Sequence, residues 1–197
     1  MPAPPDPARL RAEMRHRRRR LPAARRAAHA RRAATLFAAS PLFRRARHIA
    51  VYLPVAGEAD PLPLAELAWR RGKRVYAPVV DAVHRGRLGF APIPPDGALR
   101  PNRWGIPEPA GRPALRPPRR LDLVIVPLVA FDRRGHRLGM GAGYYDRTFA
   151  FRHRRRWRRP WLVGLAYGFQ EVPRLQAHPW DVPLDAVLTE QGLRFFG

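Results

Sequence analysis

Pro127 to Arg147 is the segment of this chain whose residue types are best suited to chemistry, and it reads PLVAFDRRGHRLGMGAGYYDR. Glycines at positions 139, 141 and 143 alternate with larger residues, and this spacing lets backbone N–H groups approach a phosphate with no side chain in the way. Arg137 adds a guanidinium that can bind phosphate through two nitrogens, and Asp146 adds a carboxylate that can hold Mg²⁺ beside phosphate oxygens. The segment therefore favours a phosphate site with a metal ion.

Two interpretations of this glycine spacing stay open. Tyr144 and Tyr145 follow the last glycine and supply flat rings and hydroxyl groups for a ring-bearing ligand. The segment lacks the Gly-Lys-Ser/Thr of a P-loop, and its GxGxG spacing is not the GxGxxG of a dinucleotide site. A glycine-rich turn that only packs a helix onto a sheet would look the same, so the spacing alone does not decide between the two.

Alternating helices and strands must position this segment. We expect helices over 8–20, 22–37 (ended by Ser40-Pro41), 62–71 and 143–151. We expect strands over 48–53, 74–79, 87–91, 121–126, 161–166 and 186–188, with loops over 92–120 and 153–159. This order predicts a three-layer α/β fold, Rossmann-like, with a mostly parallel sheet flanked by helices and preceded by a basic helical segment. We expect one domain over 1–197, with N-terminal helices in 1–40 and an α/β core in 47–192.

The ends of the predicted strands indicate where a ligand would bind. The run Leu121–Val126 is almost continuously apolar, which is typical of a central parallel strand covered on both faces. Pro54, Pro78 and Pro127 each follow a predicted strand, and ligands of such sheets bind outside the carboxyl ends of the strands. We therefore expect the site among the loops that begin at these prolines.

The composition excludes several classes of protein. The chain has no cysteine, which excludes disulfides, thiol nucleophiles and cysteine zinc sites. No apolar run reaches the roughly 18 residues that a membrane span needs, and no apolar stretch follows the basic N-terminus as in a signal peptide, so we expect a cytoplasmic protein. The net charge is +23, nearly all from arginine, since Lys73 is the only lysine. Such a charge attracts polyanions, including nucleotides, polyglutamates and nucleic acid.

The string AFD..G.RLG.G.GYYDR, from Ala130 to Arg147, resembles the signature of the 5-formyltetrahydrofolate cyclo-ligase family. Five other segments resemble blocks of the same family in the same order along the chain. They are Leu10–Arg20, Tyr52–Asp60 (YLPVAGEAD), Asn102–Pro109 (NRWGIPEP), Leu162–Gln170 and Asp181–Glu190. The resemblance spans nearly the whole chain, and six ordered blocks are far more specific than any one of them.

This resemblance implies an enzyme that closes 5-formyltetrahydrofolate, polyglutamylated or not, into 5,10-methenyltetrahydrofolate. ATP is the expected co-substrate and Mg²⁺ the expected cofactor. The γ-phosphoryl group of ATP would pass to the formyl oxygen, N10 would close the ring, and phosphate would leave with ADP as the other product. We expect a monomer with no specific nucleic-acid or membrane partner.

The resemblance also implies roles for individual residues. Arg137, Tyr144 and Asp146 are the expected catalytic residues, and Asp146 and Asp181 are the expected Mg²⁺ ligands. The expected ATP-binding residues are Arg9, Arg11, Arg15, Arg137, Leu138, Gly139, Met140, Gly141, Ala142, Gly143, Tyr144 and Tyr145. The expected substrate-binding residues are Leu53, Glu58, Trp104, Met140, Gly141, Ala142, Gly143 and Tyr144.

The chain departs from the family pattern at two positions. Pro7 stands where the family usually has a lysine, and Ala142 stands where some members have a lysine between the glycines. Compensation of phosphate charge would then fall to arginines and Mg²⁺. The motif does not require a histidine at position 136, so His136 is expected to be an exposed loop residue.

Other functions stay open at this point. The basic N-terminal helix is also typical of a solvated face or of a nucleic-acid-binding module, although no RNA-binding signature is present. A small-molecule kinase is a further alternative, but a generic kinase needs neither Glu58 nor the NRWGIPEP turn. A relative that binds folate without catalysis is the third, and Pro7 is the one feature that favours it.

Overall fold

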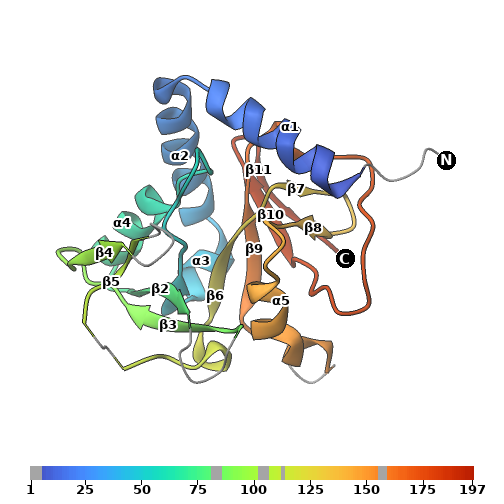
Figure 1. The fold of residues 1–197 in the computed structure, drawn as a ribbon. Helices are drawn as coiled ribbons and strands as arrows, with labels where there is room; N and C mark the ends of the chain where they lie inside the picture. The colour runs from blue at the N-terminus through green and yellow to red at the C-terminus, as the bar shows by residue number, and fades with distance from the viewer. Residues whose placement is uncertain (1–5, 81–85, 102–106, 112–113, 155–158) are drawn as a thin grey trace.

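A seven-stranded sheet forms the centre of the molecule (Figure 1). The computed structural model describes residues 6–80, 86–101, 107–111, 114–154 and 159–197. From one edge to the other, the strands are β11 (Gly192–Phe195), β10 (Ala186–Thr189), β9 (Trp161–Leu165), β6 (Leu123–Pro127), β1 (His48–Ala50), β2 (Arg74–Val80) and β3 (Leu88–Pro92). The strands from β10 to β2 pair in parallel, and the edge strands β3 and β11 pair antiparallel. The prediction of a mostly parallel sheet is confirmed.

Strand β6 shows why the sheet has a helical layer on each face. Leu123 and Ile125 pack into one hydrophobic cluster, and Val124 and Val126 pack into another. All four side chains have 0% exposure. Because successive side chains of a strand point to opposite faces, a fully apolar strand requires a cover on both sides.

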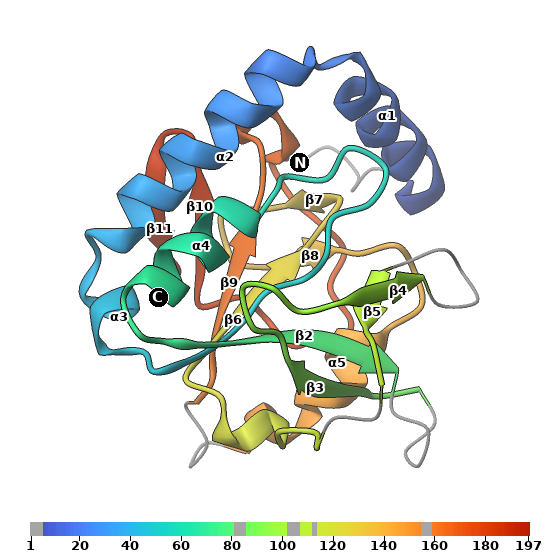
Figure 2. The ribbon, with the colours of Figure 1, turned by 90° about the vertical axis from the view of Figure 1, so that its left-hand side faces the viewer.

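Helices supply those two covers. Helices α2 (Ala23–Ala38), α3 (Pro41–Arg45) and α4 (Leu62–Arg70) pack on the Leu123 face, and Figure 2 looks onto this layer. Helix α5 (Tyr144–Phe149), continued by a 3₁₀ turn over 150–153, lies on the opposite face and places Phe149 against Val124 and Val126. The three-layer α/β expectation is therefore confirmed.

The helix expected to end at Ser40-Pro41 does end there, since α2 stops at Ala38. A short helix that the sequence did not predict, α3, then begins, because the Ser40 hydroxyl accepts the Phe43 N–H at 3.1 Å, as an N-cap serine does. Other local expectations were wrong. The expected loop over 92–120 contains strands β4 (Leu99–Pro101) and β5 (Pro107–Pro109) and a 3₁₀ turn at 118–120. Strand β11 was not expected and adds sheet residues up to 195. The division into 1–40 and 47–192 stays a prediction.

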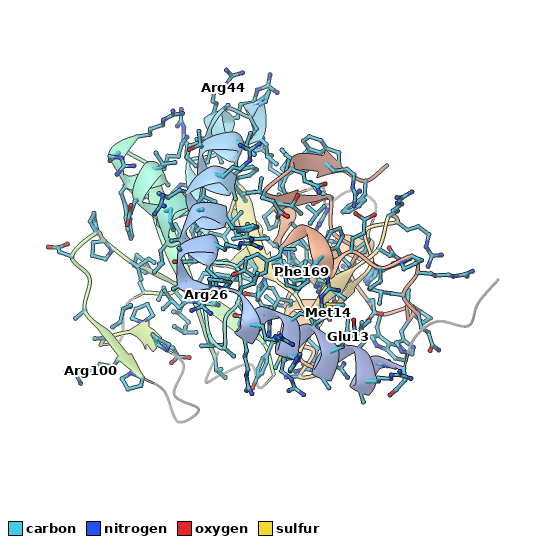
Figure 3. All side chains as sticks on the ribbon, turned by 90° about the horizontal axis from the view of Figure 1, so that it is seen from above. Glu13, Met14, Arg26, Arg44, Arg100 and Phe169 are labelled. Atoms are coloured by element: carbon cyan, nitrogen blue, oxygen red, sulfur yellow. The ribbon has the colours of Figure 1, made fainter. Side chains whose placement is uncertain are left out.

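Helix α1 (Pro7–Arg20) lies across the top of the molecule in Figure 1. It packs on a hairpin of β7 (Ala130–Phe131) and β8 (Arg137–Leu138), a segment for which the sequence predicts a loop. Figure 3 looks down on this helix, with Met14 beside Phe169. The buried residues of the helix are Leu10, Met14 and Arg18, one turn apart in succession. An arginine therefore occupies the third position of an otherwise apolar stripe.

The strand order reverses beside β1. The chain leaves β1 through α4 to β2 on one side, whereas β6 pairs with β1 on the other side. Connections that depart in opposite directions leave a crevice at the carboxyl ends of the two strands, where ligands of open α/β sheets bind. Within the described ranges, none of the helices combines the length and the apolar character that crossing a membrane would require.

Candidate functional site

A cavity of about 930 Å³ opens at this reversal point. Tyr52 and Leu53 line it just after β1, Pro78 and Val80 line it from β2, and Pro127 lines it from β6. The cavity thus lies outside the carboxyl ends of three neighbouring strands, where the prolines had indicated a site.

The loop from Gly139 to Gly143 forms one wall of the cavity. Gly141 has φ +103° and Gly143 has φ +64°, a backbone conformation that glycine adopts without the steric cost a side chain would add. Gly143 also precedes the first residue of α5. The loop therefore turns sharply into the helix while its backbone stays open to the cavity.

Two arginines from separate elements hold this loop. Arg11 of α1 donates from Nε to the Gly139 carbonyl at 2.9 Å, and its guanidinium lies 3.6 Å from the place a side chain on Gly141 would take. Arg147 of α5 donates to the carbonyls of Ala142 at 2.6 Å and Gly86 at 2.7 Å. Both arginines line the cavity, so they bring positive charge to the wall where the glycine motif predicts phosphate.

Arg137 and Asp146 form an ion pair in the same wall. Arg137 Nη2 donates to Asp146 Oδ1 at 2.6 Å, and Nη1 donates to the Val182 carbonyl. The Arg137 side chain is only 6% exposed, whereas that of Asp146 is 26% exposed. The backbone N–H of Val182 donates to the same Oδ1 at 3.1 Å. Arg137 therefore orients Asp146 and leaves this carboxylate facing the cavity.

The acidic groups of this wall suit Mg²⁺ held together with phosphate oxygens. Asp181 also lines the cavity, and its Oδ2 accepts the backbone N–H of His178 at 2.8 Å. Among the described residues there is no cluster of three histidine or acidic side chains that could hold a metal ion alone. Because Mg²⁺ is usually bound by one or two carboxylates with substrate phosphates and water, Asp146 and Asp181 fit that kind of site.

Glu58 lies in the opposite wall, in the loop that follows β1. Its side chain is 9% exposed, and its Oε2 accepts the Val55 N–H at 3.2 Å. Burial raises the pKa of Glu58 above its usual value, although the hydrogen bond from Val55 and the charge of Arg18 act in the opposite direction. A buried carboxylate at a cavity wall can accept hydrogen bonds from amide-like and amino groups of a ligand.

Two tyrosines lie close to Glu58. The Tyr52 hydroxyl donates to the Ala59 carbonyl, and the Tyr145 ring stacks on Phe149 with centroids 6.3 Å apart. Burial raises the pKa of both tyrosines, and the Glu58 charge raises it further. Both therefore stay neutral at physiological pH and present hydroxyl groups rather than charges to this part of the cavity.

The structure brings most of the predicted site residues into this one cavity. Those that line it are Arg11, Leu53, Glu58, Arg137, Leu138, Gly139, Met140, Gly141, Ala142, Gly143, Tyr144, Tyr145, Asp146 and Asp181. Arg9 and Arg15 are not among the described residues that line it. Trp104 and most of the NRWGIPEP turn lie outside the described residues.

One expectation in this region was wrong. His136 is not an exposed loop residue: its side chain is 24% exposed, and its Nδ1 lies 3.2 Å from Oδ2 of the fully buried Asp132. Burial alone would raise the pKa of Asp132, but hydrogen bonds from Leu175, Arg134 and His136 lower it. Asp132 and His136 therefore organise the β7–β8 hairpin beneath the glycine loop.

Among the residues at or behind the cavity that sequence reasoning missed, the ring-bearing and charged ones include His178, Trp180, Arg147 and Arg18. His178 and Trp180 line it, with their rings parallel at a centroid distance of 4.8 Å, and Arg147 lines it from α5. Their positions beside Asp181 and Asp146 were the available signal. Arg18 lies behind Glu58, and its signal was its helical spacing from Leu10 and Met14.

Comparisons with known proteins agree with this geometry. The model of the 5-formyltetrahydrofolate cyclo-ligase family matches residues 5–190. The 5-formyltetrahydrofolate cyclo-ligase of Escherichia coli K12 is 42% identical over 180 residues, which cover 89% of this chain and 96% of that one. That of Haemophilus influenzae is 39% identical over 148 residues, or 74% of this chain and 76% of that one. The solution structure of Aquifex aeolicus 5,10-methenyltetrahydrofolate synthetase superposes with a TM-score of 0.80 at 30% identity, over 96% of this chain and 92% of that one.

Proposed function

The chain belongs to the 5-formyltetrahydrofolate cyclo-ligase family, a family of ligases, and from this premise we propose that it converts 5-formyltetrahydrofolate and ATP into 5,10-methenyltetrahydrofolate, ADP and phosphate. One observation carries the proposal above all. A glycine loop with arginines and a buried carboxylate both line one cavity at the carboxyl edge of the sheet. That arrangement suits a ligand with polyphosphate at one end and a hydrogen-bonding ring at the other.

The folate would lie against the Glu58 wall. The amino group and ring N–H of a pterin are neighbouring donors, and an ionised carboxylate can accept from both at once. Leu53 and Val55 add apolar surface beside Glu58. Trp104, from the NRWGIPEP turn, remains a predicted contact of the same ring system.

The ATP phosphates would lie against the glycine-loop wall. Backbone N–H groups of residues 139–143 would face the phosphate oxygens, and Arg11 and Arg147 would supply positive charge from either side. Arg11 already reaches Gly139, so it compensates for the missing lysine at Pro7. Arg9 and Arg15 remain predicted ATP contacts that would have to reach the nucleotide outside the described cavity lining.

Mg²⁺ would be held by Asp146 and Asp181 together with phosphate oxygens, and when bound it would neutralise charge on the transferring phosphoryl group. Arg137 would act by holding the Asp146 carboxylate in place, through the 2.6 Å bond to Oδ1. In this arrangement the second carboxylate oxygen of Asp146 is left for the metal, and the predicted catalytic role of Arg137 becomes one of positioning.

The chemistry needs the formyl oxygen to leave, and as hydroxide it leaves poorly. Transfer of the γ-phosphoryl group to that oxygen breaks the bond to ADP and forms a phosphate ester. N10 then attacks the formyl carbon and loses its proton, and the C–O bond breaks with release of phosphate. The protein's part is positioning and charge compensation, which Tyr144, Glu58 and the arginines can provide without a covalent intermediate on the chain.

An absorbance assay tests the proposal. Purified protein is mixed with 5-formyltetrahydrofolate, ATP and Mg²⁺, and the near-ultraviolet band of the methenyl product is followed. We expect a rise in absorbance that requires both ATP and Mg²⁺. Folate binding without a rise in absorbance would identify a relative that binds folate but does not catalyse the reaction. Binding of nucleic acid in place of folate would favour the nucleic-acid-binding alternative. Preference for polyglutamates, oligomeric state and cytoplasmic location stay predictions.

A further inference from the structure

Arg18 carries a buried positive charge, and no described residue accepts a hydrogen bond from its guanidinium group. Its side chain is 1% exposed. All three guanidinium nitrogens are buried, and none has a hydrogen-bond partner within the described part of the chain. Arginine is almost never fully buried unless it is paired, and an isolated buried charge is strongly destabilising. Because burying this charge costs free energy, packing alone does not explain an arginine at this position.

The acidic group that faces Arg18 is Glu58. Glu58 Oε1 lies 3.9 Å from Arg18 Nη1, which is a charge contact but too long for a hydrogen bond. The turn that carries Glu58 also packs on the backbone of Arg18, because a side chain on Gly57 would come within 3.5 Å of the Arg18 carbonyl oxygen. Helix α1 and the Glu58 loop are therefore fitted to each other at this point.

We propose that Arg18 is a positioning residue for the folate end of the cavity: its buried guanidinium keeps the Glu58 carboxylate ionised and directed at the substrate ring. This inference rests on the proposed function, in which Glu58 accepts hydrogen bonds from the pterin. Only an ionised carboxylate can accept from two neighbouring donors, because a protonated one must itself donate.

The surroundings of Glu58 explain why it needs this cation. The titratable groups near its carboxylate are Arg18 from α1, Tyr52 just after β1 and Tyr145 from α5, and the Tyr167 hydroxyl after β9 donates to the Glu58 backbone carbonyl. The pKa of each tyrosine is raised, first by burial, so all three are neutral at physiological pH. Burial favours the protonated form of Glu58, and the Arg18 charge is the opposing influence from a side chain. A bound folate would exclude more water and increase the effect of burial.

The test compares Arg18→Met, which removes the charge and retains the length, with Arg18→Lys, which retains the charge. Arg19→Met, at an exposed position of the same helix, is the matched control. Infrared spectroscopy follows protonation of the Glu58 carboxyl group without ligand, with Glu58→Gln as the reference for subtraction. Steady-state assays then give the KM for each substrate as a function of pH.

In Arg18→Met we expect Glu58 to take up its proton at a higher pH than in the wild type. The KM for 5-formyltetrahydrofolate should rise about tenfold near neutral pH and return towards the wild-type value as the pH is raised, because the carboxylate is then restored. The KM for ATP should stay within about twofold, since the phosphate wall is unchanged. Arg18→Lys and Arg19→Met should resemble the wild type in the pH at which Glu58 is protonated, in the KM for 5-formyltetrahydrofolate and in the KM for ATP.

Stability provides a second signature. Removing one partner of a buried charge pair leaves the other charge uncompensated and destabilises the protein. Arg18→Met should therefore unfold at a lower temperature than the wild type at high pH, where Glu58 is ionised, and the difference should shrink as the pH falls and Glu58 takes up its proton. Unchanged protonation of Glu58 in Arg18→Met would overturn the proposal. So would a KM increase that is equal for folate and ATP and independent of pH, accompanied by a fall in unfolding temperature that is the same at every pH, because that pattern describes a packing residue.

The experiment separates this inference from the proposed function. The carboxyl titration needs no folate, so it decides whether Arg18 controls Glu58 even if the wild type fails to convert 5-formyltetrahydrofolate. Should Arg18→Met fold poorly, Arg18→Gln removes the charge and retains polar hydrogen bonding, and the same shift in Glu58 protonation is expected.

Discussion

The two walls of the cavity differ in how their charged groups are paired. In the glycine-loop wall (residues 137–147), Arg147 and Arg11 of α1 donate hydrogen bonds to backbone carbonyls, and Arg137 donates to Asp146. In the Glu58 wall (residues 52–58), one carboxylate meets one cation at 3.9 Å without a hydrogen bond. The charged groups of the first wall are already hydrogen-bonded in the absence of a ligand. In the second wall, the Glu58 carboxylate can still accept hydrogen bonds from a ligand.

This difference indicates where affinity and specificity arise. Several arginines share the positive charge of the glycine-loop wall, so loss of one weakens anion binding without abolishing it. Glu58 has no neighbour of the same kind among the residues that line its wall. A site with buried polar groups rejects ligands that leave those groups unpaired. We therefore expect folate discrimination to depend on Glu58 and phosphoryl transfer to depend on the opposite wall.

Asp146→Asn should give the largest effect. An amide cannot replace the charge that both Arg137 and the metal require, so we expect kcat to fall by about 10²- to 10³-fold, the scale of removing one electrostatic group from an active site. Direct titration should show 5-formyltetrahydrofolate binding unchanged. A kcat within a few-fold of the wild type would mean that the Arg137–Asp146 pair is only structural, and the functional contrast between the walls would not hold.

Glu58→Gln should weaken binding of the folate and leave binding of ATP unchanged. Loss of charge-assisted hydrogen bonds predicts a KM for 5-formyltetrahydrofolate about 10- to 100-fold higher, with the KM for ATP unchanged. Equal increases in both KM values would contradict the separation of the two walls.

The pH dependence of the wild type sharpens the same point. Because burial raises the pKa of Glu58 above its ordinary 4.5, and because binding requires the carboxylate, folate affinity should be full at higher pH. It should fall as the pH drops through that raised pKa, sooner than for an exposed glutamate. Fluorescence titration of folate across this range measures the fall, and Glu58→Gln should show none.

Arg11→Ala should have an intermediate effect on the glycine-loop wall. We expect the KM for ATP to rise about tenfold through loss of one charge-assisted contact. Arg19→Ala is the matched control on the same helix, because Arg19 is exposed and does not line the cavity, and it should change the KM by less than about twofold. If both variants are equally impaired, the nucleotide reaches further along α1 than the cavity does.

Gly143→Ala should have the smallest effect. An alanine at φ +64° costs about 1–2 kcal/mol, and its Cβ would also approach Arg147 Nη1 to 2.8 Å. Gly72→Ala is the control, because it has a similar φ of +66° with nothing within 4 Å. Thermal unfolding should show a loss of stability in both variants, and only Gly143→Ala should also raise the KM for ATP, through displacement of Arg147.

Local patterns in the sequence predicted the framework of the molecule well. The apolar run at 121–126 is sufficient to indicate a central strand, because a strand covered on both faces cannot alternate with polar residues. The glycine motif followed by Tyr144, Tyr145 and Asp146 indicated a turn that opens a helix, and this segment lines the cavity. Strand ends marked by proline indicated the edge of the sheet on which the cavity opens. Each of these properties belongs to residues that are close together in the chain.

The sequence by itself therefore determined the α/β order, the family and a set of site residues most of which line the cavity. Only the tertiary structure decided which charges meet. Arg18 looked like one more arginine of a solvated helix, yet it is buried where α1 packs against the Glu58 loop. Arg137 looked like a free phosphate contact, yet α5 and the loop at Val182 supply its partners. Burial and pairing depend on segments distant in sequence, and they change the energy of a charge far more than its immediate neighbours do.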